Sequence, residues 1–325
     1  MLDTQISDAD WQIQQLKGGT VGDVRLVTGT AETLNGEKLP YKVVWKIQKK
    51  WERFYDPNSW RREYDLYMSD LGKLFDDSLR WAECYHAEMN EDETQTQLWM
   101  EYIDGVSGNE LTIKLREHAA FELGRFQGRL YKNPEILQNI SCFSEIENIK
   151  YYLTVHRPKT DEYSYIHSDG CEIPEHLRQM MIDVDNKIKD IYDNVNSNPI
   201  VLCHRDFWHE NIIYSDKKII LLDWDCTGWG YMLEDIIQLI VDETDSKYLE
   251  EYYRKFIPAY LKGISEYIEI PNVEDLFLHA WKITVIWFGY SLVHWYMQAE
   301  SLEIKNMVID TLQKLYDMKD IKIKL

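Results

Sequence analysis

The sequence predicts an α+β protein of two lobes, an antiparallel β-sheet lobe followed by a mainly helical lobe. Three segments of the first third, residues 12–17, 23–31 and 41–48, have the composition of strands. The remainder contains apolar residues at helical spacing. A chain of 325 residues with 45% hydrophobic content can also bury a large core.

The turns and breaks in the first lobe support this assignment. The first three strands are separated by two glycine-containing turns, Gly18-Gly19 and Asn35-Gly36, and Asn-Gly is a strong hairpin signal. Asp56-Pro57 predicts a helix start, with Asp56 as the cap and proline in the first turn. The apolar stripe that follows lies at helical spacing and consists of Trp60, Tyr64, Tyr67 and Leu71.

Further strands are expected at residues 86–88 and 97–102, and Asp104-Gly105 marks the hinge between a lobe at 1–104 and a lobe at 105–325. Helices are predicted in the second lobe at residues 111–132, 174–194, 232–243, 246–263, 273–299 and 301–317. The segment 133–173 mixes polar and aromatic residues and is expected to hold a short helix and an inserted loop.

Residues 200–225 form the most informative stretch, IVLCHRDFWHENIIYSDKKIILLDWD. It predicts a strand, a polar loop, and a hairpin of two strands with its turn at residues 215–218. Asp206 and Asn211 both lie in the polar loop, and the hairpin folds Asp223 back beside Asn211. Two carboxylates and an amide suit metal-dependent phosphoryl transfer, which needs one carboxylate to orient and deprotonate a hydroxyl and two oxygen ligands for Mg²⁺ on a nucleoside triphosphate.

Other interpretations of this stretch remain open. Cys203, His204, Asp206 and His209 resemble part of a zinc cluster, although no second Cys/His pair follows at ligand spacing. A nucleophilic Cys203 beside His204 is awkward, because neighbours on a strand point to opposite faces. The loop can also be an ordinary polar connection between strands.

The first lobe contains candidate nucleotide-binding residues. Gly18 and Gly19 lie between two strands, where backbone amides can approach phosphates, although a plain hairpin turn needs the same residues. Lys46 lies in an apolar strand, where a buried ammonium needs a partner, and Glu63 on the next helix is the natural one. Such a pair holds the ammonium against the α- and β-phosphates; a structural salt bridge is the alternative. The strand end Met100, Glu101 and Tyr102 is expected to bind adenine through its backbone.

Cysteine usage and the amino terminus point to the cytoplasm. The five cysteines are scattered and include no C-x-x-C pair, as expected of reduced thiols. The first twelve residues are acidic and lack the apolar core of a signal peptide. Residues 281–297 are apolar but include Lys282 and His294, so we expect a buried helix and no membrane partner.

The formal net charge is −20, from 36 basic and 56 acidic residues. This balance disfavours nucleic acid as a partner, since nucleic acid rewards clustered lysine and arginine. It is compatible with a cationic acceptor, and equally with a well-solvated acidic surface.

The motifs together resemble the aminoglycoside phosphotransferase and choline-kinase-like superfamily, which has a protein-kinase-like fold. The similar segments occur in family order over residues 14–240: GGTVGDVRLV, VVWKIQ, SWRREYDLY, LWMEYIDG, CHRDFWHENII and LLDWD. The resemblance implies that Asp206 is the catalytic base, that Asn211 and Asp223 bind magnesium, and that Lys46 and Glu63 order the phosphates of ATP or GTP. His204 would brace the loop.

Two departures from related patterns limit what the resemblance implies. Trp208 stands where a protein kinase has a catalytic-loop lysine, and no A-P-E-like element follows, which favours a small-molecule acceptor. Where family members often carry G-D-P-x-x-D-L, this chain has Tyr231 at the first aspartate and keeps Asp235, which we expect to anchor the loop.

The acceptor site is expected in the later part of the chain, with candidate residues Asp225, Trp229, Glu234 and Trp287. Aromatic faces and carboxylates suit an amine-bearing acceptor, although core packing explains the same aromatic residues. Two functions therefore remain open. One is an O-kinase for an aminoglycoside-like or amino-alcohol acceptor, and the other is a catalytically silent binding or spore-coat-type protein.

Overall fold

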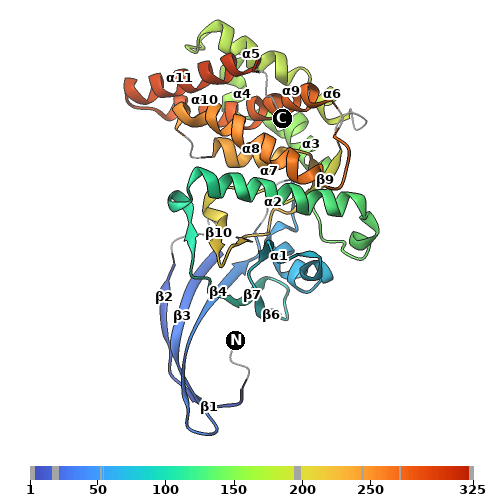
Figure 1. The fold of residues 1–325 in the computed structure, drawn as a ribbon. Helices are drawn as coiled ribbons and strands as arrows, with labels where there is room; N and C mark the ends of the chain where they lie inside the picture. Colours follow the sequence, from blue (N-terminus) through green and yellow to red (C-terminus); the bar gives the residue numbers. More distant parts are fainter. Residues whose placement is uncertain are drawn as a thin grey trace. The chain divides into compact units, whose positions relative to one another are not determined.

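The computed structural model describes residues 4–16, 22–51, 53, 55–193, 199–242, 245–270 and 272–321 (Figure 1). The chain forms two compact units. Unit 1 comprises Met1–Gly108, Ile136–Phe143 and Asn211–Cys226, and unit 2 comprises Asn109–Glu135, Ser144–Glu210 and Thr227–Leu325. The lobe boundary at residue 104 stays a prediction, whereas the α+β class is confirmed by a sheet-rich unit 1 and a helical unit 2.

A curled antiparallel sheet dominates unit 1. Its strands follow the order β1-β3-β4-β7-β6, and β2 also pairs with β3. These strands are β1 (Ile6–Ala9), β2 (Gln12–Gln15), β3 (Gly22–Thr33), β4 (Lys38–Lys49), β6 (Cys84–Met89) and β7 (Gln95–Glu101). The predicted strands are all present, and β1 is an addition that the sequence did not suggest.

A second sheet in unit 1 contains the predicted hairpin. Its order is β5-β11-β10-β8, with β5 (Leu79–Trp81), β8 (Val106–Ser107), β10 (Ile212–Ser215) and β11 (Lys218–Leu221). Strand β11 runs parallel to β5, which ties the hairpin to the early part of the chain.

Helix α1 (Ser59–Tyr67) packs on a core cluster of unit 1 through Tyr64 and Tyr67. The predicted cap is wrong: α1 starts after Asn58, which makes no side-chain cap hydrogen bond. The Asp56 carboxylate instead accepts two hydrogen bonds from Arg62, at 2.6 and 2.8 Å. Arg62 is 2% exposed, and a buried guanidinium needs a counter-charge more than a helix end needs a cap.

Unit 2 is helical, with one two-stranded sheet of β9 (Ile200–Cys203) and β12 (Gly228–Tyr231). Its α-helices are α2 (Ile113–Lys132), α3 (Ile146–Tyr151), α4 (Asp161–Ile166), α5 (Glu175–Asp185), α6 (Ile188–Asp193), α7 (Glu234–Val241), α8 (Leu249–Ile264), α9 (Val273–Thr284), α10 (Tyr290–Gln298) and α11 (Leu302–Met318). The predicted helix at 174–194 is divided into α5 and α6, and residues 133–173 contain more helix than expected.

Helices α2 and α8 pack backbone against backbone. A Cβ atom on Gly124 would lie 2.2 Å from the carbonyl oxygen of Tyr260, and one on Gly263 would lie 2.1 Å from that of Phe121. Both spacings are far below contact distance, so only glycine permits this crossing. The approach fixes α2, whose Gln127 reaches the loop described below.

The segment Val273–Gln298, which spans α9 and α10, is long and apolar enough to cross a membrane by length and composition. However, 72% of its most apolar window is buried inside the protein, as in a core helix. Trp281 is 8% exposed, and its indole N–H donates to the Leu315 carbonyl at 2.7 Å. The expected buried helix is therefore present.

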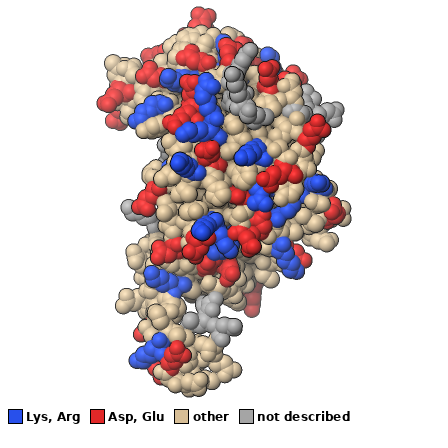
Figure 2. Space-filling view, in the orientation of Figure 1, with Lys and Arg blue, Asp and Glu red and all other residues tan. Residues whose placement is uncertain are grey.

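Acidic and basic side chains lie interspersed over the face shown in Figure 2. Lysine and arginine are not gathered there into the single large patch that nucleic acid favours.

Candidate active site

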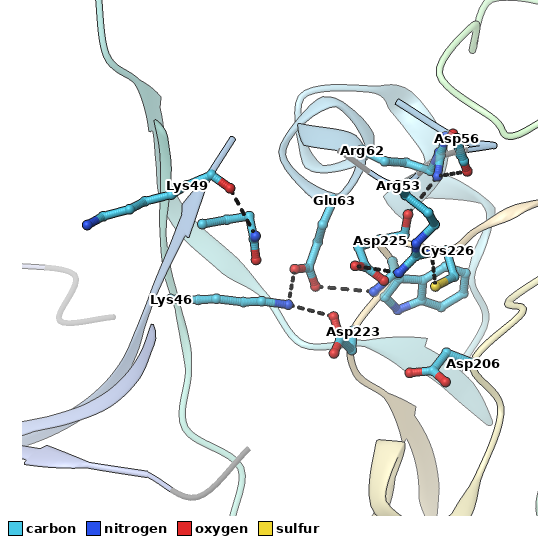
Figure 3. Close-up of polar contacts among 12 residues, drawn as sticks. Lys46, Lys49, Arg53, Asp56, Arg62, Glu63, Asp206, Asp223, Asp225 and Cys226 are labelled. Atoms are coloured by element: carbon cyan, nitrogen blue, oxygen red, sulfur yellow. Dashed lines mark hydrogen bonds and ion pairs between the residues drawn. The ribbon is translucent and has the colours of Figure 1, made fainter. Parts of the chain in front are cut away.

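Lys46 of β4 lies between two carboxylates (Figure 3). Its Nζ is 2.5 Å from Oε2 of Glu63 on α1 and 2.6 Å from Oδ1 of Asp223. The predicted pairing with Glu63 is therefore present. Burial lowers the pKa of Lys46, but Asp223, Glu63 and Asp225 outweigh it and raise the pKa above the ordinary value. The ammonium stays charged.

Glu63 is the more deeply buried partner, with a side chain 6% exposed. Burial raises its pKa, and the Lys46 ammonium opposes that change. Its second oxygen, Oε1, accepts a hydrogen bond from the backbone N–H of Trp224 at 3.3 Å. Glu63 thus holds both Lys46 and the segment that follows Asp223.

The hairpin brings Asn211 and Asp223 to one end of the second sheet. Ile212 pairs with Leu221, and the Leu222 N–H donates to the Asn211 carbonyl at 2.9 Å. The predicted turn is present between β10 and β11. Asp223 has a left-handed backbone, with φ 63°, a conformation in which aspartate and asparagine are enriched.

Asn211 and Asp223 fit magnesium of the kind carried by a nucleotide. Mg²⁺ commonly takes one or two protein carboxylates, with water and phosphate oxygens as its other ligands. The Asp223 side chain is 32% exposed and offers such an oxygen. Among the described residues, no three His, Cys, Asp or Glu side chains gather in a group that could hold a metal ion. The magnesium role of the pair stays a prediction.

Asp225 lies in unit 1 with Lys46 and Glu63. These three residues line a cavity of about 10 Å³, enough for about one water molecule. Asp225 is also 3.8 Å from Arg53. Burial raises its pKa, and Asp223 adds to the increase. The structure groups Asp225 with the lysine pair, whereas the other acceptor candidates belong to unit 2.

Arg62 is an important residue that the sequence analysis missed. Besides pairing with Asp56, its guanidinium donates to the carbonyl of Asp225 at 2.7 Å and to that of Cys142 at 2.8 Å. It therefore joins α1 to two other segments of unit 1, one of them directly after Asp223. One signal was present in the sequence: Arg62 directly precedes Glu63, which was expected to pair with a buried lysine.

In unit 2, Gln238 of α7 orients the loop that carries Asp206. Its side-chain nitrogen donates to Oδ1 of Asp206 at 3.1 Å, and its side-chain oxygen accepts the Phe207 N–H at 3.0 Å. Arg205, just before Asp206, has φ 63°. The loop is thus fixed by side-chain contacts in a strained backbone conformation.

Asp235 anchors the same loop, as predicted. It is 2% exposed and accepts the backbone N–H groups of His204 at 2.9 Å and Arg205 at 2.8 Å. Gln127 of α2 donates to it at 2.9 Å. Burial raises the pKa of Asp235 to about 6, although these donors oppose the change.

The backbone just before α7 is unusual. Leu233 is 1% exposed and has a left-handed conformation, with φ 81°.

The remaining acceptor candidates lie in packed surroundings of unit 2. The Trp229 carbonyl accepts a hydrogen bond from Arg205. Trp287 stacks on Tyr152 with ring centroids 5.7 Å apart and lies 5.6 Å from the Arg157 guanidinium. Burial raises the pKa of Glu234 to about 7, with Arg205 opposing the change. Their acceptor roles stay predictions.

The expected adenine edge is the end of β7. Met100 is 5% exposed, the Glu101 N–H donates to the Glu83 carbonyl at 2.8 Å, and Tyr102 lies 5.0 Å from Lys42. Adenine binding here stays a prediction. Gly18 and Gly19 lie outside the described residues.

Glu234 should make stability depend on pH. The pKa of Glu234 is about 7 in the folded protein and 4.5 in the unfolded chain, so the folded state holds the proton more tightly. The stabilisation that comes from this proton is fully present below pH 4.5 and is lost as pH rises through 7. We expect Glu234→Gln to be more stable than the parent at pH 8, by up to about 3 kcal/mol, and equally stable near pH 4.5. Urea unfolding at both pH values measures this. Glu300→Gln, at an exposed position, is the control, and a pH-independent difference would contradict the assignment.

Solved structures resemble the fold over nearly the whole chain. An amicoumacin kinase in complex with AMP-PNP and Ca²⁺ matches with a TM-score of 0.57 and 14% identity, covering 94% of this chain and 88% of that chain. Choline kinase from Cryptosporidium parvum matches with a TM-score of 0.57 and 16% identity, covering 95% and 90%. The predicted protein-kinase-like fold is confirmed.

Curated relatives match over shorter segments. Human ethanolamine kinase 1 is 30% identical over 108 residues, which is 29% of this chain and 24% of the human protein. The mouse protein is 27% identical over 124 residues, or 34% of this chain and 33% of its own. The chain thus matches a third or less of the length of these relatives.

A family model described as the phosphotransferase enzyme family matches residues 82–269, more than half of the chain. The matched range contains Asp206, Asn211 and Asp223, and the superfamily resemblance of the sequence motifs is confirmed. The chain belongs to the phosphotransferase enzyme family.

Proposed function

We propose that this protein is a small-molecule kinase that transfers the γ-phosphoryl group of ATP or GTP to a hydroxyl of an amine-bearing acceptor. The observation that carries the proposal is the position of Lys46 between Glu63 and Asp223. A buried cation shared by two carboxylates is costly for a purely structural role, and it suits the binding of nucleotide phosphates.

The chemistry on the nucleotide side needs positioning and charge neutralisation. Lys46 contacts the α- and β-phosphates, and Glu63 keeps its ammonium in place. Asn211 and Asp223 would hold Mg²⁺, which would supply positive charge to the phosphate oxygens.

Asp206 acts on the acceptor. Its carboxylate accepts the proton of the acceptor hydroxyl as that oxygen bonds to the γ-phosphorus and the bond to the β-phosphate oxygen breaks. The hydrogen bond from Gln238 to Oδ1 orients the carboxylate, and Asp235 holds the backbone just before it. The proton thus moves to Asp206, and the nucleoside diphosphate leaves.

Two observations support an amine-bearing acceptor. The net charge of −20 attracts cations. Several similar proteins are also named as kinases of amine-bearing alcohols, namely ethanolamine, choline and aminopropanol. An aminoglycoside-like acceptor fits the same chemistry.

Asp206→Asn should keep the fold and nucleotide binding but lose turnover by about a hundred- to ten-thousand-fold, because proton acceptance is removed while the metal ligands remain. Steady-state kinetics with an amino-alcohol acceptor, alongside a nucleotide binding curve, measure both effects. Asp216→Asn, in the exposed turn of the hairpin, is the matched control. Near-normal turnover in folded Asp206→Asn would sink the mechanism.

Asp223→Asn should abolish the extra thermal stabilisation that magnesium adds to nucleotide binding, because the charged metal ligand is lost. Asparagine tolerates the left-handed backbone at this position, so the fold should persist. Asn211→Ala should weaken the effect less, since a neutral oxygen is removed. If the parent itself shows no magnesium-dependent stabilisation by ATP or GTP, the kinase proposal is wrong and the catalytically silent binding protein is the better assignment.

The acceptor's apparent affinity should fall as salt rises, because screening shortens the range of attraction between an acidic protein and an amine to about 10 Å and below. A screen of amino alcohols, aminoglycosides and neutral polyols for nucleotide turnover, repeated at low and high salt, measures this. A neutral or anionic acceptor with salt-insensitive binding would overturn the amine assignment and leave the kinase assignment standing.

A further inference from the structure

Unit 1 carries a second hollow, lined by Lys49, Lys50, Trp51, Thr94 and Gln95. It is open to solvent and has a volume of about 490 Å³, which is within the range of pockets that hold small organic molecules. We call it the β4 groove, because it lies where β4 ends and the chain continues to Trp51.

The β4 groove is separate from the Lys46 group. In Figure 3 the Lys49 side chain points away from Glu63 and Asp223. The two adjoining strands fix its walls, since the Lys50 N–H donates to the Thr94 carbonyl at 2.7 Å and Lys49 pairs with Gln95. A nucleotide ordered by Lys46 therefore does not account for this hollow.

The lining of the groove favours an anion. Its described lining residues offer two ammonium groups and no carboxylate, in a chain with a net charge of −20. Among the described residues, neither lysine has a carboxylate oxygen within ion-pair distance. Asp23, whose pKa is lowered mainly by Arg25 and in part by Lys49, is already ion-paired with that arginine.

Trp51 adds an aromatic ring to the wall. The Arg53 guanidinium lies 4.8 Å from its ring centroid, and Arg53 is itself fixed by a hydrogen bond to Cys226 Sγ at 2.8 Å. The Trp51 Nε1 is shielded from solvent and has no hydrogen-bond partner among the described residues. Because this N–H is enclosed, a ligand in the groove would meet the ring of Trp51, which suits an apolar or aromatic body.

We propose that the β4 groove binds a small organic molecule that carries a phosphate group, with Lys49 and Lys50 neutralising the phosphate and the ring of Trp51 contacting the organic body. The size of the groove calls for an organic body attached to the anion. This site is independent of the proposed kinase reaction and of magnesium.

The test follows the indole N–H signal of Trp51 in ¹⁵N-labelled protein, assigned with Trp51→Phe, without nucleotide or magnesium. Phenyl phosphate and inorganic phosphate are titrated separately at low salt. We expect a saturable shift with phenyl phosphate. In the double variant Lys49→Gln/Lys50→Gln, binding should be at least about tenfold weaker, because the two ammonium groups supply most of an attraction that is strongest at low salt. Lys73→Gln, which removes an exposed charge elsewhere in unit 1, should bind as the parent does.

Each outcome decides a part of the proposal. A signal that does not saturate, or an equal shift in the double lysine variant, overturns the site. Inorganic phosphate binding as tightly as phenyl phosphate overturns the organic ligand and leaves a site for a bare ion. Because no nucleotide is present, these results are independent of whether the protein proves to be a kinase.

Discussion

The burial of one ammonium group between two carboxylates organises unit 1. Lys46 comes from β4, Glu63 from α1, and Asp223 from the segment after β11. Removing Lys46 leaves two carboxylates facing each other without a counter-charge, which costs several kcal/mol. Removing either carboxylate leaves one ion pair. The charge pattern therefore determines which strand, helix and hairpin end must meet.

The same logic extends to the backbone around this group. Arg62 is almost fully buried and shares its donors among one carboxylate and two carbonyls. In unit 2, Asp235 gathers two backbone N–H groups and one side-chain amide. In both units a buried charged group holds irregular backbone where no sheet or helix hydrogen bonds are available, and each lies beside a residue predicted to act on the substrate.

Sequence patterns predicted the parts of the molecule that local chemistry determines. The hairpin from Asn211 to Asp223 followed from strand composition and a polar turn, and the Lys46–Glu63 pair followed from the cost of a buried ammonium. The contacts of Arg62 were not predictable in the same way, because its partners, Cys142 and Asp225, are distant in sequence. Asp56 was misassigned because a cap and a buried counter-charge use the same residue type.

The backbone at Leu233 limits what evolution or design can place there. A leucine with φ near 81° is uncommon and costs roughly 1–2 kcal/mol relative to an ordinary conformation. Its side chain is also fully enclosed, and burial of a leucine returns about 1.5–3 kcal/mol. Glycine would remove the backbone strain but leave a cavity in place of the leucine side chain. A β-branched residue would fill that space but increase the backbone strain. The position therefore has a narrow set of acceptable residues, and sequence variation there would signal a rebuilt turn ahead of α7.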